Sequence, residues 1–223
     1  ASAFRANINR AFTKDNSRNK KVITLRRGSA ALRFDMDSGT LTTMLNKNKP
    51  TGVGRFPTLE FSGATTNLTK DTRAASPATI TEKDGTFVIE AKNTKGFDSL
   101  KWTLKPSGEV VLDYAYTLPK GLYNHAGIGM QVEADDVLHK RWMGEGPARI
   151  WKNRIQGGLL DVYAVEKQIN VPGTVYNLPE FEGCFAPWNW AVFYLEDYLN
   201  IAFENHTDVT LGVLNPVNGY NPK

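Results

Sequence analysis

The chain has 223 residues, of which 41% are hydrophobic and 22% are charged, enough apolar material for one large domain or two small ones. This hydrophobic fraction excludes wholesale disorder. No run approaches the roughly 18 apolar residues of a membrane-spanning helix, so we expect no membrane partner. The formal net charge is +4, but no zinc spacing, helix-turn-helix pattern or RNA-recognition motif accompanies it, so we expect no nucleic-acid partner.

Residues 1–20 are polar and aperiodic, which predicts a linker or N-terminal tail, with a short helix near residues 8–12. They lack an initiator methionine and the continuous apolar region of a signal peptide, so we expect a chain that was processed or cut from a longer protein. The single cysteine, Cys184, excludes an internal disulfide and leaves the redox compartment open.

From residue 21 onward, nearly every pattern predicts β-structure. Residues 31–36 alternate apolar and polar with period two, Asp37-Ser38-Gly39 predicts a turn, and residues 40–45 predict the returning strand of a hairpin. Similar runs predict further strands at residues 22–25, 57–61, 79–81, 86–91, 100–104, 109–116, 126–132, 158–164, 190–194, 199–203 and 209–213. Because amphipathic helical periodicity is almost absent, the sequence predicts an all-β fold, a large antiparallel sandwich in a single domain over residues 21–223.

Common catalytic and cofactor motifs are missing. The three histidines and the cysteine lie at no metal-ligand spacing from one another, and no serine-nucleophile elbow occurs. Gly144 and Gly146 do not form a phosphate loop, because Pro147 removes a backbone donor. Glu180 and Glu182 would share one face of an extended strand, either as a glycosidase-like carboxylate pair or as solvated acids. We expect no metal and no cofactor.

The most informative stretch runs from Arg141 to Arg154. Its glycines and proline, Gly144, Gly146 and Pro147, predict a tight, fixed turn. Planar hydrogen-bond donors and an indole follow, and these are side chains with which a surface binds or encloses sugars. They are Arg149, Trp151, Lys152, Asn153 and Arg154.

Four tryptophans carry specific expectations. Trp188 and Trp190 would share one face of an extended strand, because they are two residues apart. We leave open whether Trp151 and Trp188 face a sugar or fill the core, and we expect Trp102 and Trp190 in the core.

Residues 142–154 resemble the W-x-G-x-G-P…N/D-R motif of the C-terminal β-sandwich domain of family 2 glycoside hydrolases of the β-galactosidase type. Residues 32–41 resemble the early hairpin of the same domain, an aromatic strand followed by an S/T-G-x-L turn. Residues 179–183 resemble its P-E-F/x-x-G segment. The matches run in the right order over about residues 22–213. The segment 148–151 departs from the family, where acidic and tyrosine residues are more usual, and this leaves β-galactoside specificity open.

The resemblance implies a galactose-mutarotase-like supersandwich that packs beside the catalytic barrel of its parent chain. In that family the nucleophile and acid glutamates lie on the barrel, which this chain does not contain, so the resemblance implies a domain with no catalytic residues. It implies a galactoside or plant-wall oligosaccharide as ligand and a periplasmic or secreted location, with the cytoplasm also open. The expected sugar-facing residues are Glu145, Arg149, Trp151, Asn153, Arg154, Glu182 and Trp188.

Two alternatives remain. An aldose mutarotase or epimerase shares the expected fold, and its acid and base would be Glu182 with His125 or His139. A purely structural interaction domain would instead expose an apolar patch where its barrel packs.

Overall fold

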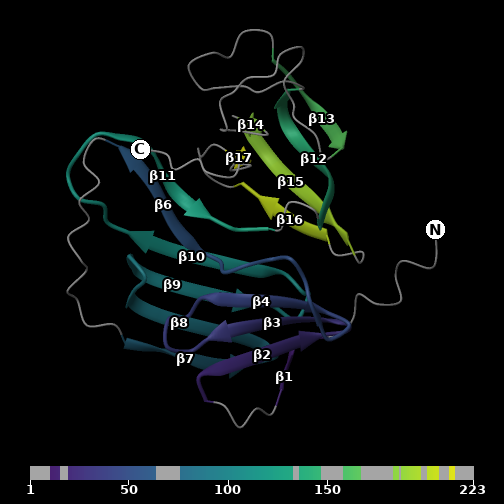
Figure 1. Cartoon of the computed structure of the whole chain (residues 1–223). Helices are drawn as coiled ribbons and strands as arrows, with labels where there is room; N and C mark the ends of the chain where they lie inside the picture. The colour runs from purple at the N-terminus through teal and green to yellow at the C-terminus, as the bar shows by residue number, and fades with distance from the viewer. Residues whose placement is uncertain are drawn as a thin grey trace. The chain divides into compact units, whose positions relative to one another are not determined.

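The computed structural model describes residues 11–15, 20–63, 76–132, 136–146, 158–166, 183–185, 187–196, 200–205 and 211–213. Most of these residues lie in β-strands, and every strand pair among them is antiparallel (Figure 1). The prediction of an all-β, antiparallel fold is confirmed.

The chain divides into two compact units, unit 1 up to Val132 and unit 2 from Glu133 to Pro222. Each unit is described by itself. The single supersandwich expected over residues 21–223 therefore stays a prediction.

Unit 1 contains two larger sheets and a two-stranded one. The first sheet has the order β1-β2-β3-β4-β5, and its strands are Thr13–Lys14, Val22–Arg27, Ala30–Asp35, Leu41–Asn46 and Lys49–Pro50. The second sheet has the order β10-β9-β8-β7, and its strands, named from β7 to β10, are Ser76–Lys83, Thr86–Thr94, Phe97–Leu104 and Val110–Tyr116. The pair of strands consists of β6, Thr58–Gly63, and β11, Tyr123–Gly129.

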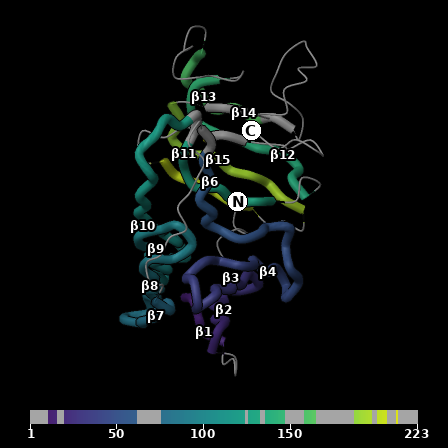
Figure 2. Tube along the Cα trace, turned by 60° about the vertical axis from the view of Figure 1, so that its left-hand side comes forward, coloured from purple at the N-terminus to yellow at the C-terminus, as the bar shows by residue number. Residues whose placement is uncertain are grey.

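The two larger sheets of unit 1 form separate layers (Figure 2). Apolar side chains from both sheets meet in one cluster, which explains why the period-two pattern of the sequence locates these strands. The buried members of the cluster are Phe12, Ile23, Leu25, Phe34, Met36, Leu41, Phe87, Ile89, Trp102 and Leu104. Trp102 lies in the core as predicted, at 3% exposed.

Part of the segment expected to be a tail belongs to this sandwich. Thr13–Lys14 pairs with β2, and Phe12 is buried in the core at 7% exposed. Ala11 and Phe12 are not helical, and the rest of the helix expected near residues 8–12 lies outside the described residues. A buried phenylalanine therefore anchors the start of the described chain.

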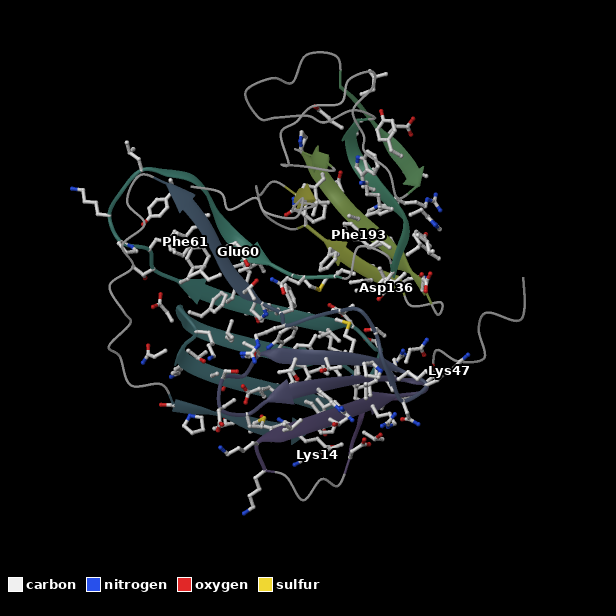
Figure 3. The ribbon with its side chains drawn as sticks, in the orientation of Figure 1. Lys14, Lys47, Glu60, Phe61, Asp136 and Phe193 are labelled. Atoms are coloured by element: carbon white, nitrogen blue, oxygen red, sulfur yellow. The ribbon has the colours of Figure 1, made fainter. Side chains whose placement is uncertain are left out.

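The β6–β11 pair carries its own aromatic contact. Phe61 of β6 meets Tyr123 of β11 edge-on, with ring centroids 6.1 Å apart, while the neighbouring Glu60 is exposed (Figure 3). The Oγ1 hydroxyl of Thr58 donates to the carbonyl oxygen of Gly129 at 2.9 Å and ties the two strands together.

Unit 2 contains a four-stranded sheet of order β13-β12-β15-β16. Its strands are β12, Val137–Gly146, β13, Leu159–Glu166, β15, Trp188–Leu195, and β16, Asn200–Glu204. A separate two-stranded sheet pairs β14, Gly183–Phe185, with β17, Leu211–Val213.

One face of the four-stranded sheet forms the core of unit 2. Phe193 of β15, labelled in Figure 3, packs edge-on against Phe203 of β16 with ring centroids 6.1 Å apart. Both rings pack against the buried cluster of Trp142, Trp188 and Ala191. This core is separate from the cluster that fills unit 1.

Candidate functional site

The glycine-rich motif continues a strand. Gly144 and Gly146 are the last residues of β12, Val137–Gly146, so a turn at the glycines themselves is wrong, and Pro147 of the predicted turn lies outside the described residues. Neither glycine has a left-handed φ. A Cβ at Gly144 would lie 2.7 Å from the carbonyl oxygen of Pro187, and one at Gly146 would lie 2.7 Å from the ring of Tyr163. Glycine is therefore needed at both positions, because the backbone of Pro187 and the ring of Tyr163 approach the strand closely.

One face of β12 carries the aromatic core of unit 2. Trp142 is 1% exposed and Trp188 is 8% exposed, and both belong to one buried cluster with Ala191. Tyr163 lies directly opposite Trp142 on β13, with ring centroids 5.4 Å apart. Of the two interpretations left open for Trp188, its burial favours the core over an open ring on which a sugar stacks.

A β-bulge separates the two tryptophans of β15. Met143 of β12 pairs with Trp190, but the next residue, Gly144, pairs with Trp188. Asn189 is thus an extra residue on β15, and the usual rule that residues two apart share a face does not apply across it. Trp188 faces the core, and Trp190 faces the other side of the sheet.

Asn205 holds this bulge in place. Its backbone N–H donates to the carbonyl oxygen of Asn189 at 2.7 Å, and its side-chain Nδ2 donates to that of Trp188 at 2.9 Å. The expectation that Trp188 and Trp190 share one face is therefore wrong. Trp190 is half-exposed and is not part of the buried cluster in which it was expected.

The half-exposed Trp190 is the centre of a row across three strands. Met143 on β12, Trp190 on β15 and Glu204 on β16 lie directly opposite one another. Arg141 and Glu145, two residues before and after Met143, share its face because the β12–β13 register is unbroken there. We call this surface the Trp190 face, and its members on β12, β15 and β16 are Arg141, Met143, Glu145, Trp190, Val192 and Glu204. On β13 the exposed Val162 and Leu160 lie opposite Met143 and Glu145 and border the same face.

The Trp190 face combines an indole with charged groups. Arg141 and Glu204 are exposed, while Met143, Trp190 and Glu145 are half-buried. An aromatic ring with carboxylates and a guanidinium around it offers one apolar plane together with acceptors and donors at its edge. Such a surface can contact a ligand that has both an apolar face and hydroxyl groups.

Glu145 lies at the end of the Trp190 face with its backbone fixed. Its N–H donates to the carbonyl oxygen of Pro187 at 3.1 Å, and its own carbonyl oxygen accepts from Nε1 of Trp142 at 3.3 Å. Its carboxylate oxygen Oε2 is buried, and no described residue donates a hydrogen bond to it. A carboxylate oxygen that is buried without a donor raises the cost of keeping Glu145 ionised.

Tyr163 lies near the same end of the sheet as Glu145, with its ring on the core face opposite Trp142. Its hydroxyl donates to the carbonyl oxygen of Leu159 at 2.7 Å. Desolvation raises the pKa of the Tyr163 phenol, and the negative charges of Asp161 and Glu145 raise it further. This end of unit 2 is therefore an acidic environment in which the phenol stays protonated.

The histidines of the mutarotase alternative lie in different units. His125 belongs to β11 of unit 1, and His139 belongs to β12 of unit 2. The ring of His139 stacks on that of Tyr194, with centroids 4.0 Å apart and planes at 16°. Their proposed partner, Glu182, lies outside the described residues.

Two of the seven expected sugar-facing residues can be placed. Glu145 lies on the Trp190 face and Trp188 lies in the core behind it. The others, Arg149, Trp151, Asn153, Arg154 and Glu182, lie outside the described residues.

Sequence reasoning missed the rest of the Trp190 face. Met143 and Glu204 are far apart in the chain, and only the strand register places them on either side of Trp190. The bulge at Asn189 and its partner Asn205 leave no mark on the hydrophobic pattern of the sequence. The pattern therefore could not indicate that Trp190 faces away from the core.

Within the described part of the chain, no helix is long and apolar enough to cross a membrane. The same residues contain no group of three or more histidine, cysteine, aspartate or glutamate side chains that could hold a metal ion. Comparison with known proteins found no family model that matches this chain and no curated protein that matches its sequence.

Proposed function

We propose that this chain is a non-catalytic, carbohydrate-binding β-sandwich module of the type that accompanies the barrel of family 2 glycoside hydrolases, and that sugar binds on the Trp190 face. The observation that carries the proposal is the Met143–Trp190–Glu204 row, in which a partly exposed indole lies beside an exposed carboxylate on one face of the sheet. The ordered sequence resemblance over about residues 22–213 supports the choice of family.

The binding mode follows from the chemistry of the face. The apolar C–H plane of a pyranose stacks on Trp190, and its hydroxyl groups donate to the carboxylates of Glu204 and Glu145. Arg141 donates to ring or hydroxyl oxygens of the same ligand.

The ligand class within this proposal is a galactoside or a plant-wall oligosaccharide. The test is isothermal titration of the whole chain with lactose, galactan fragments, xylo-oligosaccharides and cello-oligosaccharides. We expect at least one of them to bind, Trp190→Ala to weaken that binding at least tenfold, and Glu145→Gln to weaken it less.

Leu122→Ala is the matched control, because Leu122 is 82% exposed in unit 1 and lies outside the Trp190 face. This variant should bind as the wild type does. A folded wild-type chain that binds none of the sugars, or equal affinity of the wild type and Trp190→Ala, would overturn the proposal.

A second candidate is an interaction domain, and exposed apolar residues on β13 favour it. Leu159, Leu160 and Val162 are 72%, 63% and 43% exposed, and β13 is the edge strand of its sheet among the described residues. Under this candidate they pack against the barrel of the parent chain. Sedimentation at increasing concentration tests it, because self-association should decrease in the Leu159→Ser, Leu160→Ser double variant.

A further inference from the structure

A second aromatic surface lies in unit 1, on the strand β10. Among the described residues β10 pairs only with β9, so it is an edge strand. Leu112, opposite Trp102, packs against the core of the sandwich, whereas Tyr114, two residues further on the same face, is 40% exposed. The inner face of the strand therefore leaves the core and reaches solvent at Tyr114.

Two tyrosine rings lie parallel at this point. The rings of Tyr114 and Tyr116 have centroids 6.2 Å apart and planes within 3° of each other. We call them the tyrosine pair. Tyr116, like Tyr114, lies opposite a buried residue of β9, in its case Phe97.

Phe97 fixes the orientation of the tyrosine pair. Its ring is fully buried and meets both tyrosines edge-on, with centroids 6.4 Å away in each case and interplanar angles of 86° and 82°. Edge-to-face contacts of this kind are stabilising. A ligand that stacks on the pair would therefore find rings that are already ordered, which reduces the entropy lost on binding.

Polar groups lie at the same end of the strand pair. The hydroxyl of Thr117, the residue after Tyr116, donates to Oδ2 of Asp98 at 2.8 Å. Asp98 follows Phe97, so this polar pair adjoins the three aromatic rings along the chain. Hydrogen-bonding groups therefore follow the tyrosine pair directly along the chain.

We propose that the tyrosine pair is a second carbohydrate-binding surface, distinct from the Trp190 face. A phenol offers an apolar plane and a hydroxyl at its rim, and a pyranose has the same two features. The exposed part of this surface is phenolic, so an apolar ring plane and a hydroxyl group lie together, and both can contact a sugar ring. The ligand class rests on the proposed function, whereas the position of the surface does not.

The test compares four forms of the whole chain: wild type, Trp190→Ala, the double variant Tyr114→Ala, Tyr116→Ala, and the triple variant. Affinity electrophoresis through gels containing soluble galactan, xyloglucan or glucomannan measures retardation of each form. We expect Trp190→Ala to keep part of the retardation by at least one polysaccharide, and the triple variant to lose it. A fivefold or greater difference in affinity between these two forms is the expected result.

Two controls address folding. Tyr114→Phe, Tyr116→Phe keeps both rings and should keep most of the binding, and Asp113→Asn changes the other face of β10 and should have no effect. Circular dichroism of each variant establishes that the sheet is intact.

The outcomes separate the two proposals. If Trp190→Ala alone abolishes binding and the tyrosine double variant binds as the wild type does, the second surface is refuted while the Trp190 face stands. If the tyrosine double variant abolishes binding and Trp190→Ala has no effect, the tyrosine pair is the sugar surface and the Trp190 face is refuted. If no polysaccharide retards the folded wild type, both fail.

Discussion

The indole Nε1 of Trp102 donates a hydrogen bond of 2.9 Å to the carbonyl oxygen of Gly39. Trp102 belongs to β9 and Gly39 belongs to the turn between β3 and β4, so this bond links the two sheets of unit 1. A second bond acts in parallel, because the Oγ1 hydroxyl of Thr94 donates to the carbonyl oxygen of Ser38 at 3.0 Å. Ser38 and Gly39 of this turn are buried, and the opposite sheet satisfies their carbonyl groups.

The first prediction is that Gly39→Ala strongly destabilises unit 1. Gly39 has a φ of +71°, and a Cβ there would lie 2.6 Å from the Cβ of Ala91. The left-handed conformation and the overpacking together should cost roughly 2–4 kcal/mol in the free energy of unfolding. Gly28→Ala is the control, since its φ is +61° with no atom within 4 Å of an added Cβ, and it should cost only about 1 kcal/mol.

Urea unfolding followed by circular dichroism measures both changes. Equal losses in the two variants would mean that the contact with Ala91 is not restrictive, and that the sheets can separate at this turn at little cost.

The second prediction contrasts two tryptophans. Trp102→Phe removes the donor to Gly39 and reduces a ring that is 3% exposed and meets Phe34 edge-on at 5.3 Å, so it should cost roughly 2–4 kcal/mol. Trp190→Phe alters a half-exposed ring on the Trp190 face and should cost less than about 1 kcal/mol. Thermal unfolding of the two variants checks this order, and a larger loss in Trp190→Phe would place that indole in a core.

The first hairpin was predictable because each of its signals is local. Alternation over residues 31–36 and the turn at residues 37–39 predicted what the structure has as β3 and β4. The alternation predicts the strands because one face of each strand packs against the opposite sheet. The Asp37-Ser38-Gly39 sequence predicts the turn because Gly39 accepts a left-handed φ.

The direction of Trp190 was not predictable, because it depends on a single extra residue. Asn189 forms the bulge only when β15 is paired with β12, and the sequence does not contain that register. The prediction of a turn at Gly144 and Gly146 was wrong for a related reason. Glycine is used both in turns and where a neighbour approaches closely, and only the position of Trp188 and Tyr163 distinguishes the two uses.

The third prediction tests that use of the two glycines. An alanine at Gly144 would meet the carbonyl oxygen of Pro187 at 2.7 Å and the Cα of Trp188 at 2.8 Å, which are backbone atoms that move only if the strands separate. An alanine at Gly146 would meet the Tyr163 ring, which can rotate away. Gly144→Ala should therefore cost about 3 kcal/mol and Gly146→Ala about 1 kcal/mol.

Hydrogen exchange of β12 and β15 measures these losses within unit 2. Faster exchange in Gly144→Ala than in Gly146→Ala is expected. The reverse order would mean that the contact with the Tyr163 ring, and not the approach of β15, requires glycine in this strand.

The last prediction concerns the phenol of Tyr163. Desolvation and the charges of Asp161 and Glu145 raise its pKa above the ordinary value of 10.0. Because an acid with a raised pKa holds its proton longer in the folded state, its contribution to stability is present below pH 10.0 and is lost as the pH rises through the folded pKa. Glu145→Gln removes one negative charge at almost constant shape, so it should lower the pKa of Tyr163. The tyrosinate absorbance of each form, after subtraction of the same form carrying Tyr163→Phe, gives the titration of this one group. An unchanged or higher pKa in Glu145→Gln would show that the Glu145 carboxylate is too far from the phenol, or too well screened, to act on it.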